Sequence, residues 1–179
     1  MKPSFTDHIP QGDSLPRAIC DRCGFIAYDN PKIVVGSVVR YGRKILMCRR
    51  AIEPSRGLWT LPAGYLEHGE TPEEGAMREA FEEATARVTI EALLAVYTIR
   101  RIGQVQLIYR ATVAEPAFAP GPESEAVRLF DEDALPLGEL AFPSVRWALG
   151  QERARGGPFV NPPDLPPQMP ESSARVTGE

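Results

Sequence analysis

GYLEHGETPEEGAMREAFEE, residues 64–83, has the pattern of a loop that leads into one helix, and the rest of the fold can be placed around it. Thr71 followed by Pro72 is typical of a helix start, because the threonine side chain can cap free amide groups and proline suits the first turn. Glu74, three residues after Thr71, stands where a capping-box acid accepts the amide of the cap residue. The pattern therefore predicts a helix from Pro72 to about Ala86.

One side of this predicted helix is acidic. At 100° per residue, Glu79, Glu82 and Glu83 fall together on that side, at spacings i, i+3 and i+4. Like charges at these spacings destabilise a helix by roughly a few tenths of a kcal/mol per pair. The opposite side is apolar, and we expect it to be buried; its residues are Met77, Ala80, Phe81 and Ala84.

The acidic side has two interpretations. It is either an ordinary solvated helix face, or a site where a divalent cation turns the repulsion into binding energy. Residues 64–83 hold seven glutamates and one arginine, a charge of −6, so the remaining residues sum to +2 of the chain's net −4. This concentration favours Mg²⁺, which prefers carboxylate oxygens together with substrate phosphates.

The chain as a whole is 179 residues long, 43% hydrophobic and 25% charged, which suits one soluble domain with short appendages. A net charge of −4 and a pI near 5.4 argue against a protein that coats nucleic acid, because such proteins need a basic face. The first residues have no apolar run typical of a secretion signal, and no segment is long and apolar enough to span a membrane. We therefore expect a cytoplasmic protein.

Several further segments have strand or helix patterns. A hairpin is predicted over residues 32–51 with Gly42 in its turn, and a second β-rich pair over 86–114, split at Gly103. Short strands are expected in 58–66 and 125–130, and a closing amphipathic helix over 143–155. Strand pairs interleaved with two helices predict an α/β or α+β sandwich with a mixed sheet.

The cysteines lie near the start of the chain, apart from one. Cys20 and Cys23 form a CxxC followed by glycine, the shape of a zinc knuckle, in which a tight turn aims two thiolates at one metal. A closed zinc site needs four ligands, but His8 is the one nitrogen ligand nearby and Cys48 falls in a predicted strand. A zinc site and a metal-free turn both remain open.

The spacing G64-x5-E70-x7-R78-E79-A80-x-E82-E83 resembles the Nudix box, GX5EX7REUXEEXGU, where U is a bulky aliphatic residue. Thr85 stands where that consensus has glycine, so the end of the helix could differ from that of the family. The resemblance implies a Nudix hydrolase, an α/β/α sandwich with a mixed sheet that cleaves a nucleoside diphosphate linked to another moiety.

The resemblance also implies roles for residues of the box. Glu79, Glu82 and Glu83 match the family's metal-binding glutamates, with Glu79 and Glu83 also taking part in catalysis, and the carbonyl of Ala63 matches a further ligand. The positions that hold the loop and helix in shape are Gly64, Glu70 and Arg78. The implied metal is Mg²⁺, with Mn²⁺ as an alternative, and the implied assembly is a homodimer.

Two acids outside the box lie directly before a predicted strand. In Nudix ADP-ribose pyrophosphatases a similar E-x-E supplies a metal ligand and a base, which implies Glu125 as the extra ligand and Glu123 as the base. The alternative is a solvated acidic loop. Arg49 and Arg50 end a predicted strand and are candidates for binding phosphate or ribose, or else ordinary surface charge.

Aromatic residues near the predicted cleft are the remaining candidates for ligand contacts. Trp59, Tyr65 and Tyr97 could stack an adenine or flavin ring, but we expect each of them to pack in the core.

Segments beyond the box resemble the Nudix group that carries a small N-terminal zinc ribbon and includes a plant FAD and ADP-ribose pyrophosphatase. The likeness covers about residues 9–149. Members have two CxxC pairs, and here the first is missing, so either the ribbon has decayed or the true start lies upstream. The expected parts are a ribbon remnant at 1–30, the hydrolase domain at 31–150, and at 151–179 the end of the last helix with a proline-rich, disordered tail.

The predicted activity is Mg²⁺-dependent hydrolysis of the diphosphate bond of FAD or ADP-ribose, which releases AMP and the partner monophosphate. One alternative is another nucleotide substrate, such as NADH or a diadenosine polyphosphate. A second is a Nudix module that senses such ligands without cutting them. The ligand is in each case a small nucleotide, with no nucleic-acid or membrane partner.

Overall fold

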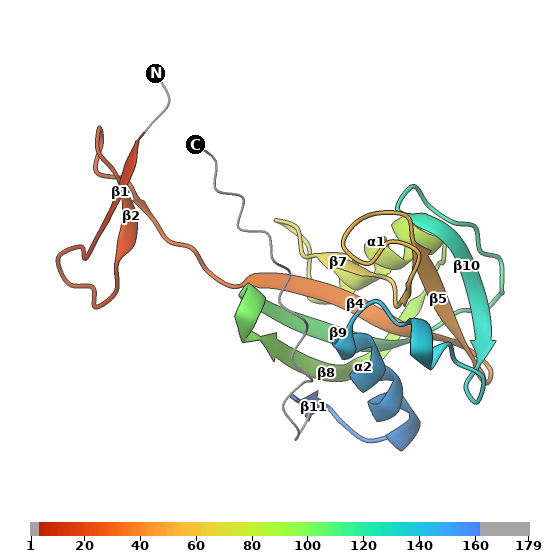
Figure 1. The fold of residues 1–179 in the computed structure, drawn as a ribbon. Coiled ribbons are helices and arrows are strands. Elements are labelled where there is room, and N and C mark those ends of the chain that lie inside the picture. The colour runs from red at the N-terminus through yellow and green to blue at the C-terminus, as the bar shows by residue number, and fades with distance from the viewer. Residues whose placement is uncertain (1–3, 162–179) are drawn as a thin grey trace. The chain divides into compact units, whose positions relative to one another are not determined.

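The computed structural model describes residues 4–161, which divide into two compact units between Pro31 and Lys32. Figure 1 shows the course of both. The predicted boundary at residue 30 thus falls one residue from the division between the units. Most of the predicted proline-rich tail lies outside the described residues.

The first unit is a small antiparallel sheet of three strands. Its strands are β1 (Phe5–His8), β2 (Arg17–Cys20) and β3 (Ile26–Ala27). Cys20 is buried, but most large apolar side chains of the unit are exposed: Phe5, Ile9, Leu15, Phe25 and Tyr28. Units below about 40 residues usually need a metal, a disulfide or a partner surface for stability.

The second unit is built on a mixed sheet whose strand order is β10-β5-β4-β9-β8-β11. β4 runs parallel to β9, and β11 runs parallel to β8, whereas the other neighbours are antiparallel. The bounds are β4 (Lys32–Tyr41), β5 (Lys44–Arg50), β8 (Thr89–Ile99), β9 (Gln104–Thr112), β10 (Ser124–Asp131) and β11 (Phe159–Val160). Both predicted strand pairs are confirmed, with Gly42 and Gly103 at positive φ in their turns.

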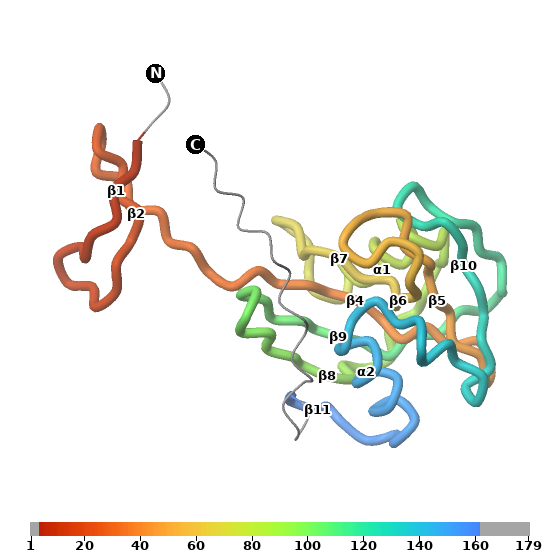
Figure 2. The backbone as a smooth tube through the Cα atoms, viewed as in Figure 1, coloured from red at the N-terminus to blue at the C-terminus, as the bar shows by residue number. Residues whose placement is uncertain are grey.

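The hairpin of β4 and β5 opens soon after its turn. The two strands pair with each other only at two positions beside the turn. Further along, β6 (Trp59–Thr60) pairs with β5, and β7 (Ala63–Tyr65) pairs with β4. The path from β5 through β6 to β7 can be followed in Figure 2. The short predicted strand thus becomes two pieces that lie between β4 and β5, and the bend between them brings Ala63 and Gly64 beside the middle of β4.

Two helices cover opposite faces of this sheet (Figure 1). Val35 and Val39 of β4 pack toward α1 (Pro72–Ala84), whereas Val38 packs toward α2 (Pro143–Ala154). Short 3₁₀ turns, η1 (Arg100–Ile102) and η2 (Leu137–Glu139), join neighbouring elements. The predicted sandwich with a mixed sheet is confirmed. None of the helices among residues 4–161 is long and apolar enough to cross a membrane.

The face of α1 that turns inward differs from the prediction. Ala80 and Ala84 are fully buried, as expected, but Met77 and Phe81 are 37% and 46% exposed. The helix lies too close to the sheet for bulky side chains, since a Cβ at Gly75 would come within 2.9 Å of Val35 Cγ2. As a result α1 carries two glutamates, Glu79 and Glu83, into the interior.

The end of the chain also departs from expectation in one respect. A disordered tail is predicted after the last helix, yet β11 adds a short parallel strand to β8 there. Asn161 secures it, because its side chain accepts a hydrogen bond from the amide of Thr98 at 2.8 Å.

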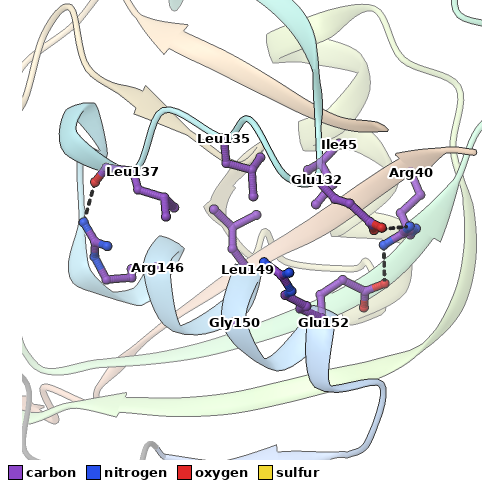
Figure 3. A pocket seen from close by; sticks show the side chains of 10 residues that line it. Arg40, Ile45, Glu132, Leu135, Leu137, Arg146, Leu149, Gly150 and Glu152 are labelled. Atoms are coloured by element: carbon purple, nitrogen blue, oxygen red, sulfur yellow. Dashed lines mark hydrogen bonds and ion pairs between the residues drawn. The ribbon is translucent and has the colours of Figure 1, made fainter. Parts of the chain in front are cut away.

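A buried ion network ties α2 to the sheet. Glu152 on α2 has only 4% of its side chain exposed and lies between Arg40 of β4 and Arg110 of β9, with N–O distances of 3.2 and 2.6 Å. Arg40 also pairs with Glu132 at 3.0 Å, and Figure 3 shows Arg40 between the two carboxylates. The network holds two neighbouring strands and the last helix at one end of the sheet.

We predict that Glu152→Ala lowers the free energy of unfolding by about 3–5 kcal/mol, because it leaves Arg110 partly buried without a carboxylate and leaves Arg40 with Glu132 alone. Urea unfolding followed by circular dichroism measures the change. Asp133→Ala is the matched control, since its ion pairs with Arg43 and Arg153 are well exposed and their loss costs less than about 1 kcal/mol. Equal losses in the two variants would contradict the account.

Candidate functional site

The site is carried by α1, whose ends are fixed as the sequence indicates. The Thr71 side chain accepts a hydrogen bond from the amide of Glu74, and the Glu74 carboxylate accepts one from the amide of Thr71. Thr85 takes the left-handed conformation, φ 51°, in which the family consensus places glycine. Its hydroxyl accepts a hydrogen bond from the amide of Ala119 at 2.8 Å. The helix therefore ends in the usual way despite the substitution.

Arg78 is the centre of a hydrogen-bond network between α1 and the loop that precedes it. Its guanidinium binds both oxygens of Glu70, at 3.0 and 2.7 Å, and donates to the carbonyl of Tyr65 at 2.9 Å. This bidentate pair holds the pKa of Glu70 down, at about 2. Arg78 also binds Glu79 at 2.7 Å and Glu82 at 3.0 Å. One arginine thus joins the loop before the helix to two glutamates on the helix.

Gly64 lies directly against the carboxylate of Glu79. A Cβ at position 64 would come within 2.3 Å of Glu79 Oε1, so any side chain there would displace the carboxylate. Gly36 makes a similar close approach beneath it, since its Cβ would lie 2.4 Å from the Cβ of Ala63. Glycine is required at position 64 by this contact.

Glu83 is the more deeply buried of the two glutamates. It is 6% exposed, and its Oε2 accepts a hydrogen bond from the amide of Ala63 at 3.2 Å. The pKa of Glu83 is raised to about 8, mainly by burial. The hydrogen bond from Ala63 and the charge of Arg50 lower this pKa, whereas the charge of Glu79 raises it. Without a cation, folding therefore disfavours the charged form of this carboxyl group.

The pKa of Glu79 is also raised, and burial is again the largest cause. Burial raises its pKa, Arg78 lowers it, and the charges of Glu82 and Glu123 raise it. Glu123 raises the pKa of Glu83 as well. The structure therefore brings Glu123, from the loop before β10, into the electrostatic range of both buried glutamates.

The loop that carries Glu123 is fixed to the end of α1. The amide of Gly121 donates to the carbonyl of Glu83 at 3.0 Å, and that of Ala119 to the carbonyl of Ala84 at 3.1 Å. A Cβ at Gly121 would meet the carbonyl of Glu82 at 1.7 Å, so this approach requires glycine. Gly121 is a site residue that is not among the sequence-based predictions. The signal available was a glycine between two prolines just before the acids.

Glu125 lies in β10 at an irregularity of the strand. Ser124 pairs with Arg50 and Ala126 pairs with Arg49, so Glu125 is the extra residue of a β-bulge. Its carboxylate binds Arg56 Nε at 3.1 Å. Its role as a metal ligand stays a prediction.

Arg49 and Arg50 both help to fold the loop after β5. Arg49 Nε donates to the carbonyl of Gly57 at 2.7 Å, and Arg50 Nε donates to that of Pro54 at 2.8 Å. The guanidinium of Arg50 also lies over the ring of Phe142. Its positive charge stabilises the charged form of Glu83. Of these two arginines, Arg50 is the one whose charge lowers the pKa of Glu83.

Core packing is confirmed for two of the three aromatic candidates. Trp59 is buried edge-on against Phe130, and Tyr97 is fully buried with its hydroxyl bonded to Gln151. Tyr65 differs, because 51% of it is exposed, with the ammonium group of Lys32 over its ring.

The donor set suits a hard cation. Glu79, Glu83 and Glu123 provide carboxylate oxygens, and a positive charge among them would offset both burial and mutual repulsion. Across residues 4–161, however, no three side chains of the ligand types Asp, Glu, His or Cys converge closely enough to hold a metal as they stand. Glu79 and Glu82 are engaged by Arg78, so the glutamates would have to turn toward a metal.

Cys20 and Cys23 lie in a tight turn closed by Gly24, whose amide donates to the carbonyl of Cys20 at 2.8 Å. Backbone amides of Arg22 and Cys23 point at the Cys20 sulfur and lower the pKa of its thiol. Cys23 is exposed, and the two sulfurs are not bridged. The turn has the form of a zinc knuckle with two of its four ligands, so zinc stays a prediction.

A cavity of about 170 Å³ lies elsewhere, beside α2 (Figure 3). Arg40, Leu135, Arg146 and Leu149 are among the residues that line it. None of the predicted site residues does so, and α1 covers the other face of the sheet. This cavity is therefore separate from the glutamate cluster.

Comparison with known proteins gives two family matches. The model described as the NUDIX domain matches residues 30–148, and the model described as Nudix N-terminal, a zinc ribbon, matches residues 4–29. The second match agrees with the predicted ribbon resemblance.

Individual relatives agree with these matches. A crystal structure of a Nudix hydrolase from Nitrosomonas europaea is 44% identical, with a TM-score of 0.81 over 88% of this chain and 93% of that chain. An ADP-ribose pyrophosphatase of Methanocaldococcus jannaschii is 30% identical over 64% of this chain and 69% of its own length. A MutT-like protein of Streptomyces ambofaciens is 39% identical over 56% of this chain, but the match spans only 63% of that protein.

Three observations lead to the same assignment. They are the sandwich with a mixed sheet, the capped helix with two buried glutamates, and the family model that matches most of the chain. This chain belongs to the Nudix family of hydrolases.

Proposed function

We propose that this protein hydrolyses the diphosphate bond of a nucleoside diphosphate linked to another moiety, with Mg²⁺ as its cofactor. ADP-ribose and FAD are the first substrates to consider, and the products would be AMP and the partner monophosphate. The observation that carries the proposal is the pair of buried glutamates on α1, Glu79 and Glu83, whose charge the fold leaves without full compensation. The name of the Methanocaldococcus relative supports ADP-ribose as the first candidate.

The residues that would hold the metal are three glutamates of α1 and two groups from neighbouring segments. They are Glu79, Glu82, Glu83 and the carbonyl of Ala63, with Glu125 as a further ligand. A bound Mg²⁺ polarises phosphate oxygens and lowers the pKa of coordinated water. Gly64 and Arg78 fix the position of Glu79, because one leaves room for its carboxylate and the other binds it.

Glu123 is the proposed general base. It lies close enough to Glu79 and Glu83 to raise their pKa values, yet it is itself exposed and can reach solvent. A carboxylate in that position can accept a proton from water as the water attacks phosphorus. Gly121 holds the loop of Glu123 against the end of α1 and so fixes the reach of the base.

Arg50, which pairs with Ser124 beside the candidate base, is the proposed phosphate-binding residue. Its Nε is committed to a loop carbonyl, but a guanidinium has four further N–H donors that suit phosphate oxygens. Arg49 has the same arrangement at the neighbouring position and is a second candidate.

The main alternative is a module that binds such a nucleotide without cutting it. Every glutamate of the box is present here, and two of them are buried at a cost that simple ligand sensing does not require. Retention of these acids favours catalysis. NADH and diadenosine polyphosphates remain as alternative substrates of a hydrolase.

The direct experiment incubates the purified protein with ADP-ribose, FAD, NADH and diadenosine polyphosphates, with Mg²⁺, with Mn²⁺, or with excess EDTA. We expect AMP release from ADP-ribose or FAD with metal and none with EDTA, measured by chromatography. If no divalent metal supports AMP release from any of the four, the hydrolase proposal is wrong.

Glu83→Gln tests the role of the buried acid. The amide keeps the shape and the hydrogen bond from Ala63 but loses the charge, so we expect the turnover number to fall at least about 100-fold while the circular dichroism spectrum is unchanged. Glu67→Gln is the matched control, since Glu67 is an exposed acid of the same loop and helix that has no proposed role, and its rate should stay within about twofold of wild type. A fully active Glu83→Gln enzyme would remove Glu83 from the metal site.

A further inference from the structure

Arg56 is a charged residue at the site to which neither the sequence nor the family matches give a role. It lies in the loop between β5 and β6, and its side chain is 64% exposed. Its Nε binds Glu125 Oε1 at 3.1 Å, and among the described residues this is its one hydrogen-bond partner. The remaining N–H groups of its guanidinium are therefore open to a ligand.

The backbone on both sides of Arg56 is fixed. The residue before it, Ser55, donates through its hydroxyl to the carbonyl of Ala141 at 3.2 Å. The residue after it, Gly57, accepts at its carbonyl from Arg49 and donates its amide to the carbonyl of Arg50 at 2.8 Å. The loop thus presents the Arg56 side chain from a well-defined position, which lowers the entropy cost of binding.

The same loop is joined to the loop that carries the candidate base. The amide of Ala51 donates to the carbonyl of Glu123 at 2.8 Å. Glu123 follows Gly121 by two residues, and the amide of Gly121 donates to the carbonyl of Glu83 at 3.0 Å, so this contact places the 51–58 loop near the end of α1 that carries Glu83. Arg56 therefore lies at the rim of the proposed site.

The partner of Arg56 is placed by the bulge in β10. Ser124 and Ala126 pair with consecutive residues of β5, and Glu125 is the extra residue between them. A bulge re-aims the side chain of its extra residue, and such bulges occur often beside active sites. Here the bulge turns Glu125 toward Arg56, across 69 residues of sequence.

We propose that Arg56 binds the diphosphate group of the substrate, and that Glu125 occupies its guanidinium until an anionic ligand replaces the carboxylate. This inference rests on the proposed function, because it assigns the substrate's phosphates to this rim. Both side chains of the Arg56–Glu125 pair reach solvent, with 64% and 34% exposed, and such ion pairs are weak. A group with several charged oxygens can therefore displace the one carboxylate. Glu125, once released, is free for the ligand role predicted from the sequence.

The test is a double-mutant cycle on metal-free binding of inorganic pyrophosphate, measured by isothermal titration calorimetry with excess EDTA. The four proteins are wild type, Arg56→Ala, Glu125→Gln and the double variant. Arg56→Ala should weaken binding. Glu125→Gln should tighten it about two- to fivefold, since it frees the guanidinium from an exposed ion pair. In the Arg56→Ala background, Glu125→Gln should tighten binding no further.

Two results overturn the inference. If Glu125→Gln tightens binding equally with and without Arg56, the effect is general charge repulsion and Glu125 does not restrain Arg56. If Arg56→Ala leaves binding unchanged, Arg56 does not contact the phosphates. Arg56→Lys keeps the charge but loses the planar fork, and it should bind with an affinity between those of wild type and Arg56→Ala.

The cycle needs neither metal nor turnover, so it separates this inference from the proposed function. A protein that hydrolyses ADP-ribose but shows no coupling between Arg56 and Glu125 refutes only the role of Arg56. A protein that hydrolyses no nucleotide refutes the proposed function, whatever the cycle gives.

Discussion

Two carboxyl groups on one helix are buried side by side, and most contacts of the site hold them in that position. Glu79 and Glu83 lie one turn apart on the inner face of α1, where burial raises the pKa of both. Arg78 and the amide of Ala63 each compensate one of them in part. The rest of the cost of burying the two charges destabilises the metal-free protein. A divalent cation bound here would remove that cost, and the gain would strengthen its binding.

Other parts of the fold follow from this constraint. The opening between β4 and β5 admits β6 and β7, and the bend between these two short strands sets Ala63 and Gly64 against the glutamates. At the C-terminal end of α1, Gly121 allows the loop before β10 to touch the helix. Three glycines at close approaches, Gly36, Gly64 and Gly121, let backbone and carboxylates share a space that side chains would fill.

Much of this fold follows from local signals in the sequence. Thr71, Pro72 and Glu74 predict the helix start because capping depends on neighbouring residues alone, and alternating strands with glycine turns predict the sheet. The buried face of α1 was predicted wrongly at Met77 and Phe81, because periodicity assigns large apolar residues to the core and takes no account of how closely the helix approaches β4. The pairing of Glu125 with Arg56 and the contact of Gly121 with α1 join distant segments, so no local pattern reveals them.

The central claim is that the buried glutamates form a metal site whose negative charge is only partly compensated without the metal. Its most direct test compares the free energy of unfolding of wild type and of a Glu79→Gln, Glu83→Gln double variant, each with and without Mg²⁺. At Mg²⁺ concentrations ten to a hundred times the dissociation constant, we predict that wild type gains about 1.4–2.7 kcal/mol. The variant should be at least as stable as metal-free wild type and gain nothing from Mg²⁺. An unchanged wild type, or an equal gain in both proteins, would contradict the account.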